Sequence, residues 1–311
     1  MTVFLLTGCG TQVTQTPDTN EASHELKIVT TFPPLYSFVA GVAGDAVEIT
    51  NLVPPGASVH TWEPSASALR ELAKADLFVM NGLELEPFAE DLIESVQNSE
   101  LEVLVTSEAV HDDLQNATEM IELEEEHESE SEHEHEHHHD GQDPHIWLNP
   151  LLAVKQVEAI KNTLVRIDPE NASAYRENTS AYITELQELN EEIREKLQTA
   201  LKKDFIVFHN AYDYFLSEYG LSEYKKAAIE PFPGQEPTAA YFQELIELIE
   251  DKGVTIIFTE PQFSPRVVQN IQEETGAKSF EIDPIGLELD KEGYADNLRS
   301  LAETFVTAFS Q

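Results

Sequence analysis

The sequence is poor in cysteine and in basic residues. Its 311 residues include a single cysteine, Cys9, so an intramolecular disulfide cannot form and a metal site built on several thiolates is excluded. Lysine and arginine together number 18 against 59 acidic residues, which gives a formal net charge of −41 at pH 7. This charge excludes nucleic acid and anionic membranes as electrostatic partners and favours cations.

Long hydrophobic runs are also absent, because no stretch reaches the ~20 apolar residues of a membrane-spanning helix. A short apolar run near the start ends in Leu6-Thr7-Gly8-Cys9, which resembles a bacterial lipobox, where the cysteine becomes the lipidated first residue after cleavage. We therefore expect residues 1–25 to be a signal remnant and tether. The protein is expected to be extracytoplasmic, at the outer face of the cytoplasmic membrane or in the periplasm, and to be anchored by a lipid on Cys9. The alternative is a free cysteine in a flexible N-terminal segment.

Apolar residues make up 41% of the chain, enough for a core, and the length predicts two domains. From Leu26 onward, short apolar runs alternate with segments of helical periodicity, which favours parallel sheets with helices on both faces. The expected strands are 26–30, 47–53, 77–80, 101–106, 205–208, 224–229, 254–259 and 278–282. The expected helices are 34–44, 65–75, 87–97, 150–167, 168–203, 238–252, 265–275 and 293–309, with a shorter one before residue 219.

The segment 168–203 is predicted to be one long helix, with Asp168 as N-cap and Pro169 at the first helical position. A helical hairpin broken near Leu189 is the alternative. The predicted fold class is therefore α/β with two lobes, 26–167 and 204–311, each a parallel sheet flanked by helices and joined by one long rigid connector helix. The first lobe includes an acidic, histidine-rich loop at about 115–142 that we expect to be disordered.

Four possible metal ligands stand near the carboxyl ends of expected strands, where open α/β sheets bind their ligands. His60 lies in the loop after strand 47–53, and His145 follows the long loop after strand 101–106. His209 directly follows strand 205–208, and Asp283 directly follows strand 278–282. Two of the four come from each half, so a shared site would lie in the cleft between the lobes.

Each of these residues also has a simpler interpretation. His60 and His145 are compatible with loop histidines that bind backbone groups, His209 with a buried core histidine, and Asp283 with a turn before Pro284. Outside the histidine-rich run only two other histidines remain. His24 belongs to the tether, and His111 is expected at the surface.

Six short segments, in the same order along the chain, resemble the metal-binding lipoproteins of zinc and manganese ABC transporters, the cluster A-I solute-binding proteins. The segments are 60–65 (HTWEPS), 74–82 (KADLFVMNG), 143–150 (DPHIWLNP), 209–212 (HNAY), 236–238 (EPT) and 258–262 (FTEPQ). The likeness runs from about Leu26 to the C-terminus. It implies that the metal ligands are His60, His145, His209 and Asp283, the four residues that stand near strand ends.

Position 209 is informative because manganese members of this family look to have Glu or Asp there. An imidazole gives a set of three nitrogens and one oxygen, which suits tetrahedral Zn²⁺, whereas Mn²⁺ favours more carboxylates. The resemblance therefore implies Zn²⁺, and a manganese receptor of the same fold is the alternative. Glu63 and Glu260 are expected to be structural carboxylates or to support the ligands from behind, without binding the metal.

The implied function is that of a monomeric receptor that captures Zn²⁺ outside the cytoplasm and delivers it to an ABC permease without chemical turnover. A zinc-dependent hydrolase is an alternative, since His133 to His137 match H-E-x-x-H. That match arises in a low-complexity run with nothing to bury one face of a helix. A catalytic zinc also keeps one position for water, whereas four protein ligands would fill the site. A surface adhesin or zinc store is a further alternative.

The acidic run itself predicts weak accessory metal sites, with a solvated linker as the alternative. The histidines concerned are His127, His133, His135, His137, His138 and His139. The surrounding carboxylates are expected to raise the imidazole pKa values, so protons compete with metal as the pH falls through about 6 to 7.

Deletion of residues 119–140 is therefore expected to lower the number of Zn²⁺ ions bound per chain at neutral pH, because it removes these imidazoles. Isothermal titration of the full chain and the deletion variant measures this difference, which should shrink on mild acidification. Equal stoichiometry at neutral pH would contradict the prediction.

Overall fold

The computed structural model describes residues 25–114, 142–230, 234 and 237–311. Cys9, the tether and the six histidines from His127 to His139 lie outside these residues. Within the described ranges, none of the helices combines the length and the hydrophobicity needed to cross a membrane.

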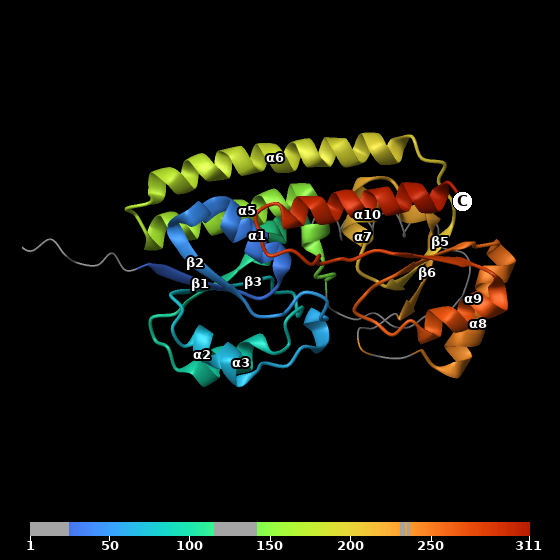
Figure 1. Ribbon diagram of the computed structural model, residues 1–311, viewed down its shortest axis with the longest axis horizontal. Coiled ribbons are helices and arrows are strands. Elements are labelled where there is room, and N and C mark those ends of the chain that lie inside the picture. Colours follow the sequence, from blue (N-terminus) through green and yellow to red (C-terminus); the bar gives the residue numbers. More distant parts are fainter. Residues whose placement is uncertain (1–24, 115–141, 231–233, 235–236) are drawn as a thin grey trace, which may run out of the picture.

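The N-terminal lobe is built on a parallel four-stranded sheet with the strand order β2-β1-β3-β4. The strands are β1 (Leu26–Thr30), β2 (Val47–Asn51), β3 (Leu77–Met80) and β4 (Glu102–Val105). Helices α1 (Pro33–Ala43) and α5 (Pro150–Ile167) lie on one face of the sheet, and α2 (Ala66–Leu72) and α3 (Ala89–Val96) lie on the other (Figure 1). Ser65 caps α2, because its side chain accepts a hydrogen bond from the Ala68 N–H.

The C-terminal lobe repeats this arrangement, with the parallel strand order β6-β5-β7-β8. Its strands are β5 (Phe205–His209), β6 (Lys225–Glu230), β7 (Ile256–Thr259) and β8 (Lys278–Glu281), and its helices are α7 (Asp213–Glu218), α8 (Ala239–Lys252), α9 (Arg266–Thr275) and α10 (Gly293–Phe309). Every residue of β5 is buried, as expected for a central strand that is covered on both faces. The predicted fold class, two parallel α/β lobes, is confirmed.

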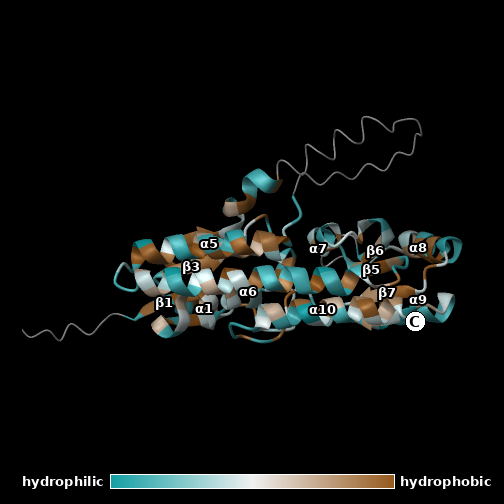
Figure 2. Ribbon diagram, turned by 90° about the horizontal axis from the view of Figure 1, so that it is seen from above, coloured by the Kyte–Doolittle hydropathy of each residue, from teal (hydrophilic) through white to brown (hydrophobic). Residues whose placement is uncertain are grey.

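A single helix, α6 (Ala172–Gln198), passes along both lobes (Figure 1). At ~1.5 Å per residue it is about 40 Å long. The helix is continuous through Leu189, so the alternative of a hairpin broken near that residue is wrong. Its buried stripe includes Tyr175, Tyr182, Leu189 and Ile193. Figure 2 shows α5, α6 and α10 side by side, and contacts join α6 to both of the others.

The predicted N-cap of this helix is also wrong. Asp168 is instead the C-cap of α5, and Asn171 is the N-cap of α6. The Asp168 carboxylate accepts hydrogen bonds from Tyr175 Oη (2.5 Å) and Asn171 Nδ2 (2.8 Å). The aspartate therefore fastens the turn between two helices, a role that depends on a tyrosine seven residues later.

The two lobes share one hydrophobic core, which includes Phe38 and Trp147 from the first lobe and Phe305 from the second. Hydrogen bonds reinforce the contact. Trp147 Nε1 donates to the Pro284 carbonyl at 2.7 Å, and Tyr294 Oη donates to the Trp147 carbonyl at 2.7 Å. The sheets are thus fixed by a packed interior as well as by the connector helix.

The contact between α1 and α6 depends on the absence of a side chain at Gly41. A Cβ there would lie 2.5 Å from Tyr182 Cδ1. An alanine in a helix interior normally stabilises by ~0.5–1 kcal/mol relative to glycine, but we expect Gly41→Ala to lower the free energy of unfolding by about 1–3 kcal/mol through overpacking. Urea denaturation measures the change.

The Tyr182→Leu background provides the control for this prediction. The smaller side chain should remove most of the cost of the Gly41→Ala change, because the two residues are in contact and their effects are not additive. An equal cost in both backgrounds would show that the packing of Gly41 against Tyr182 is not the cause.

Candidate metal centre

His60 reaches the boundary between the lobes from a loop of the N-terminal lobe. It lies in a short 3₁₀ turn, η2 (Val59–Thr61), between β2 and α2. Val59 is buried and anchors the turn, while His60 is half-buried. A loop at the carboxyl end of a parallel strand is the place where sequence reasoning expects a ligand, and the structure puts His60 there.

His145 is held by Asp143, two residues earlier in the chain. One oxygen, Asp143 Oδ1, accepts hydrogen bonds from the His145 backbone N–H at 3.0 Å and from the His145 ring Nδ1 at 2.6 Å. Because a carboxylate only accepts, Nδ1 carries the proton and Nε2 keeps its lone pair. Tyr214 Oη in turn donates to the Asp143 carbonyl at 3.0 Å.

Sequence reasoning did not identify Asp143. A signal was present, since an aspartate two residues before a histidine is well placed to accept that residue's backbone N–H in an Asx turn. The chain then enters η4 (Ile146–Leu148), and Asn149 caps α5 through a bond from the Leu151 N–H at 2.8 Å. His145 is therefore fixed one 3₁₀ turn before a capped helix.

His209 comes from the C-terminal lobe as the last residue of β5, and it is buried. Its Nδ1 lies 3.5 Å from Glu260 Oε2. Glu260 directly follows β7, the strand next to β5, and it is also buried. Neighbouring strand ends therefore place an imidazole beside a carboxylate.

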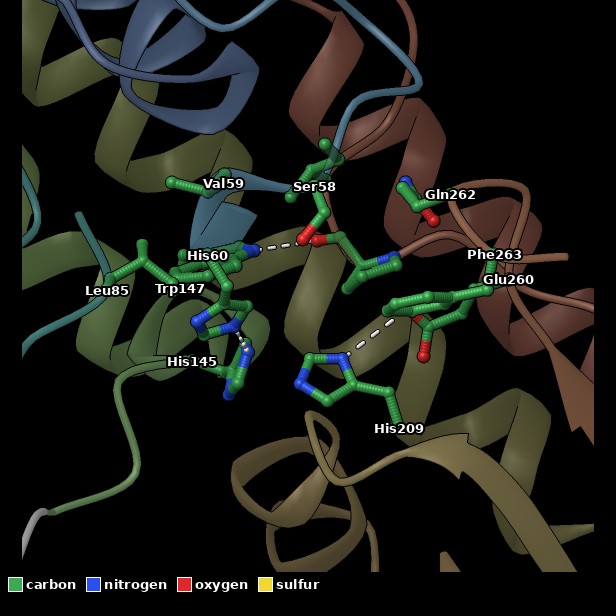
Figure 3. A pocket seen from close by; sticks show the side chains of 12 residues that line it. Ser58, Val59, His60, Leu85, His145, Trp147, His209, Glu260, Gln262 and Phe263 are labelled. Carbon is green, nitrogen blue, oxygen red and sulfur yellow. Dashed lines mark hydrogen bonds and ion pairs between the residues drawn. The ribbon is translucent and has the colours of Figure 1, made fainter. Parts of the chain in front are cut away.

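The three imidazoles point toward one another (Figure 3). His60 Nε2 and His145 Nε2 are 3.1 Å apart. One ring nitrogen from each of His60, His145 and His209 lies within 4.8 Å of the others. Two nitrogens bound tetrahedrally to one zinc at ~2.0–2.1 Å would be about 3.3 Å apart, so the pair at 3.1 Å is already close to the spacing of a shared ion.

The cavity at the histidines is small and mostly apolar. Its volume is about 20 Å³, room for one particle the size of a water molecule. Val59, Leu85, Trp147, Phe263 and Ile285 form part of the lining. A space of this size fits a single ion.

Asp283 lies near this group but is not within the 4.8 Å cluster. Its Oδ1 accepts hydrogen bonds from Gln262 Nε2 at 2.7 Å and from the Ile285 N–H at 3.0 Å. Its Oδ2 is buried and has no hydrogen-bond partner in the described part of the chain. The next two residues, Pro284 and Ile285, line the cavity. The structure thus gathers three of the four predicted ligands, while the fourth is connected to the cavity lining through Gln262.

The other predicted site residues differ in whether they line the cavity. Glu260 lines the cavity, as expected of a carboxylate that supports a ligand. Glu63 is exposed and is not part of the cavity lining, so the geometry gives no support to its predicted role. His111, expected at the surface, is exposed.

Burial, together with the nearby imidazoles, lowers the pKa of His60 from 6.5 to about 2. Burial is the main cause, because it penalises the charged ring, and repulsion from His145 and His209 adds to it. His60 is therefore neutral at physiological pH and offers a lone pair without first releasing a proton.

This shift predicts that the metal-free protein loses stability in acid. Below pH 6.5 the unfolded chain protonates His60 while the folded chain does not, so the free energy of unfolding falls as the pH is lowered from 6.5 towards 2. The slope for one such proton approaches about 1.4 kcal/mol per pH unit. Urea denaturation of the metal-free chain between pH 7.5 and 5 measures it.

The His60→Asn variant should have a shallower pH dependence than the wild type, whereas His111→Asn, at an exposed position, should keep the wild-type slope. Identical slopes for wild type and His60→Asn would show that His60 does not titrate in this way.

The chain is similar in sequence and structure to proteins of zinc uptake and manganese binding. The chain is 33% identical over 301 residues to the high-affinity zinc uptake system protein ZnuA of Bacillus subtilis, covering 95% of this chain and 91% of that protein. It is 29% identical over 314 residues to the manganese-binding lipoprotein MntA of Halalkalibacterium halodurans, covering 99% and 95%.

Among solved structures, a crystal structure of ZnuA superimposes with a TM-score of 0.75 and 28% identity, covering 92% of this chain and 99% of that one. The family model for the zinc-uptake complex component A, periplasmic, matches residues 28–308. The chain therefore belongs to the ZnuA family of solute-binding proteins of metal ABC transporters.

Proposed function

We propose that this protein captures Zn²⁺ outside the cytoplasm and delivers it to the permease of an ABC transporter. The convergence of His60, His145 and His209 on a cavity with room for one ion carries the proposal. Imidazole nitrogens are strong ligands for Zn²⁺. The zinc-uptake relatives support this choice of cargo, and the manganese-binding relative keeps Mn²⁺ as the competing ion.

Asp283 is the fourth ligand in this proposal. A buried carboxylate oxygen without a hydrogen-bond partner is costly, and a cation would compensate Oδ2. Asp143 and Glu260 serve a different purpose. Each faces the Nδ1 atom of a histidine, at 2.6 Å for Asp143 and 3.5 Å for Glu260, and so favours the tautomer whose Nε2 is free for the metal.

The same ligand set argues against turnover. A catalytic zinc keeps an open position for water, whereas three imidazoles and one carboxylate fill a tetrahedral site. The small volume of the cavity, about 20 Å³, also favours a single ion over an organic substrate. We infer that the ion is transported cargo and that the protein is not an enzyme.

Capture at the outer face of the cytoplasmic membrane by a lipid-anchored monomer completes the proposal. Cys9 would be the lipidated residue, and the histidines from His127 to His139 would bind additional zinc weakly; these residues lie outside the described structure. A net charge of −41 favours the approach of cations. Transfer to the permease requires that the protein bind Zn²⁺ reversibly.

The test is metal analysis combined with competition between Zn²⁺ and Mn²⁺ for the purified protein. The wild type should bind zinc in preference to manganese. His60→Ala should weaken zinc binding by more than the roughly 10- to 100-fold that loss of an outer-shell partner costs. His209→Glu should shift the preference towards Mn²⁺, because a carboxylate suits the harder ion.

His111→Ala and His111→Glu are the matched controls, since they change an exposed histidine, and both should bind metal as the wild type does. These measurements are best made on a chain lacking residues 119–140, so that zinc bound by the accessory histidines does not add to the zinc bound at the cavity. Equal zinc binding by wild type and His60→Ala in that background would contradict the proposed site.

A further inference from the structure

A turn with an unusual backbone conformation contacts the loop that contains His145. It connects β3 to α3 and begins at Asn81. Gly82, Leu83 and Glu84 all have positive φ angles, of 88°, 56° and 60°. A leucine or glutamate in this region costs free energy and persists only where the surrounding structure enforces it. Position 82 favours glycine, because a Cβ there would lie 2.5 Å from Val105 Cγ1.

Glu86 closes this turn from inside the protein. It is buried, and its carboxylate accepts three hydrogen bonds. Oε1 accepts from Thr31 Oγ1 at 2.8 Å and from the Asn81 N–H at 2.7 Å, and Oε2 accepts from the Gly82 N–H at 3.0 Å. Two of the three donors are backbone groups of the turn itself. Removing an acceptor would therefore leave buried donors unpaired and release the strained segment.

Asn81 connects this turn to the ligand loop. Its Nδ2 donates to the Pro144 carbonyl at 2.9 Å and to the Gly82 carbonyl at 3.1 Å. Its Oδ1 accepts from Gln156 Nε2 at 3.2 Å, and Gln156 belongs to α5, the helix that follows His145. The amide side chain is thus held from two sides and bonds to the residue immediately before His145.

Two leucines of the turn reach the same region through apolar contacts. Leu83 packs against the cluster that contains Ile146, the residue immediately after His145. Leu85 is buried and lines the cavity between the histidines. The turn therefore contacts the chain on both sides of His145 as well as the space that receives the ion.

We propose that Glu86 and Asn81 are positioning residues of the metal centre, which act on the ion through His145. Glu86 holds the left-handed turn, and the turn sets the backbone of Pro144 and Ile146 so that the ring of His145 meets those of His60 and His209. This inference rests on the proposed function, because it assumes that His145 binds the ion. Neither residue touches the cavity through its own polar atoms.

The test is a double-mutant cycle on zinc affinity, in a chain lacking residues 119–140 at a temperature where urea denaturation shows every variant to be folded. Glu86→Gln keeps the shape of the side chain and replaces one acceptor with a donor. We expect it to weaken zinc binding about tenfold. In the His145→Ala background the same change should alter affinity less than twofold, because the residue through which it acts is missing.

Glu90→Gln is the matched control, since Glu90 is an exposed glutamate of α3, and it should bind zinc as the wild type does. Asn81→Ala provides a second route to the same answer if Glu86→Gln is too unstable to measure. It removes the bond to Pro144 and should show the same dependence on His145.

A purely structural role for Glu86 predicts a lower free energy of unfolding with unchanged zinc affinity, and that result would overturn the proposal. Equal losses of affinity in the wild-type and His145→Ala backgrounds would overturn it as well. The His60→Ala variant separates the two levels of inference. If it binds zinc like the wild type, the proposed function fails; if it does not, while Glu86→Gln binds normally, this inference alone fails.

Discussion

The constraint on which the rest of the structure depends is the close approach of three imidazoles in a buried space. Rings whose nitrogens lie within 4.8 Å of one another cannot all be charged. Burial is the main cause of the low pKa of His60, and repulsion from the other two rings adds to it. Binding one metal ion also needs each ring to direct a lone pair inwards. Asp143 meets that requirement for His145 by accepting a hydrogen bond from the protonated Nδ1, which leaves the Nε2 lone pair free. Glu260 faces Nδ1 of His209 in the same way.

Bringing these rings together requires the two lobes to be fixed relative to one another. His60 and His145 belong to the N-terminal lobe and His209 to the C-terminal lobe. Trp147 connects them, since its indole donates to the carbonyl of Pro284, next to Asp283, and its own carbonyl accepts from Tyr294. With α6 packed along both lobes and one shared core beneath it, the interlobe distance is set by the interior of the protein.

Rigidity on this scale fits a receptor whose cargo is a single ion. A cavity of about 20 Å³ leaves little freedom for the ligands, and geometry is one of the means by which proteins select among divalent metals of similar affinity. The strained turn from Asn81 to Glu86 adjoins this cavity through Leu85. Buried hydrogen bonds compensate its unfavourable backbone and join it to Pro144, and Leu83 packs against the cluster that contains Ile146.

The sequence alone predicted most of the fold, because alternating strands and helices are encoded by local periodicity and by residues such as Ser65 at a helix start. It also identified three histidines that the structure gathers, since parallel strands present their carboxyl ends at one edge. Its errors concern interactions between distant residues. Asp168 has the sequence signature of an N-cap, but in the structure its carboxylate accepts a hydrogen bond from Tyr175.

The tertiary structure alone decided which nitrogen of His145 is free, why His60 stays neutral, and that one buried oxygen of Asp283 has no hydrogen-bond partner among the described residues. Each of these facts depends on distances of a few ångströms between segments far apart in the chain. Local sequence determines which residues stand at the ends of strands. Packing between the lobes determines how those residues face one another, and hence their protons and their readiness to bind an ion.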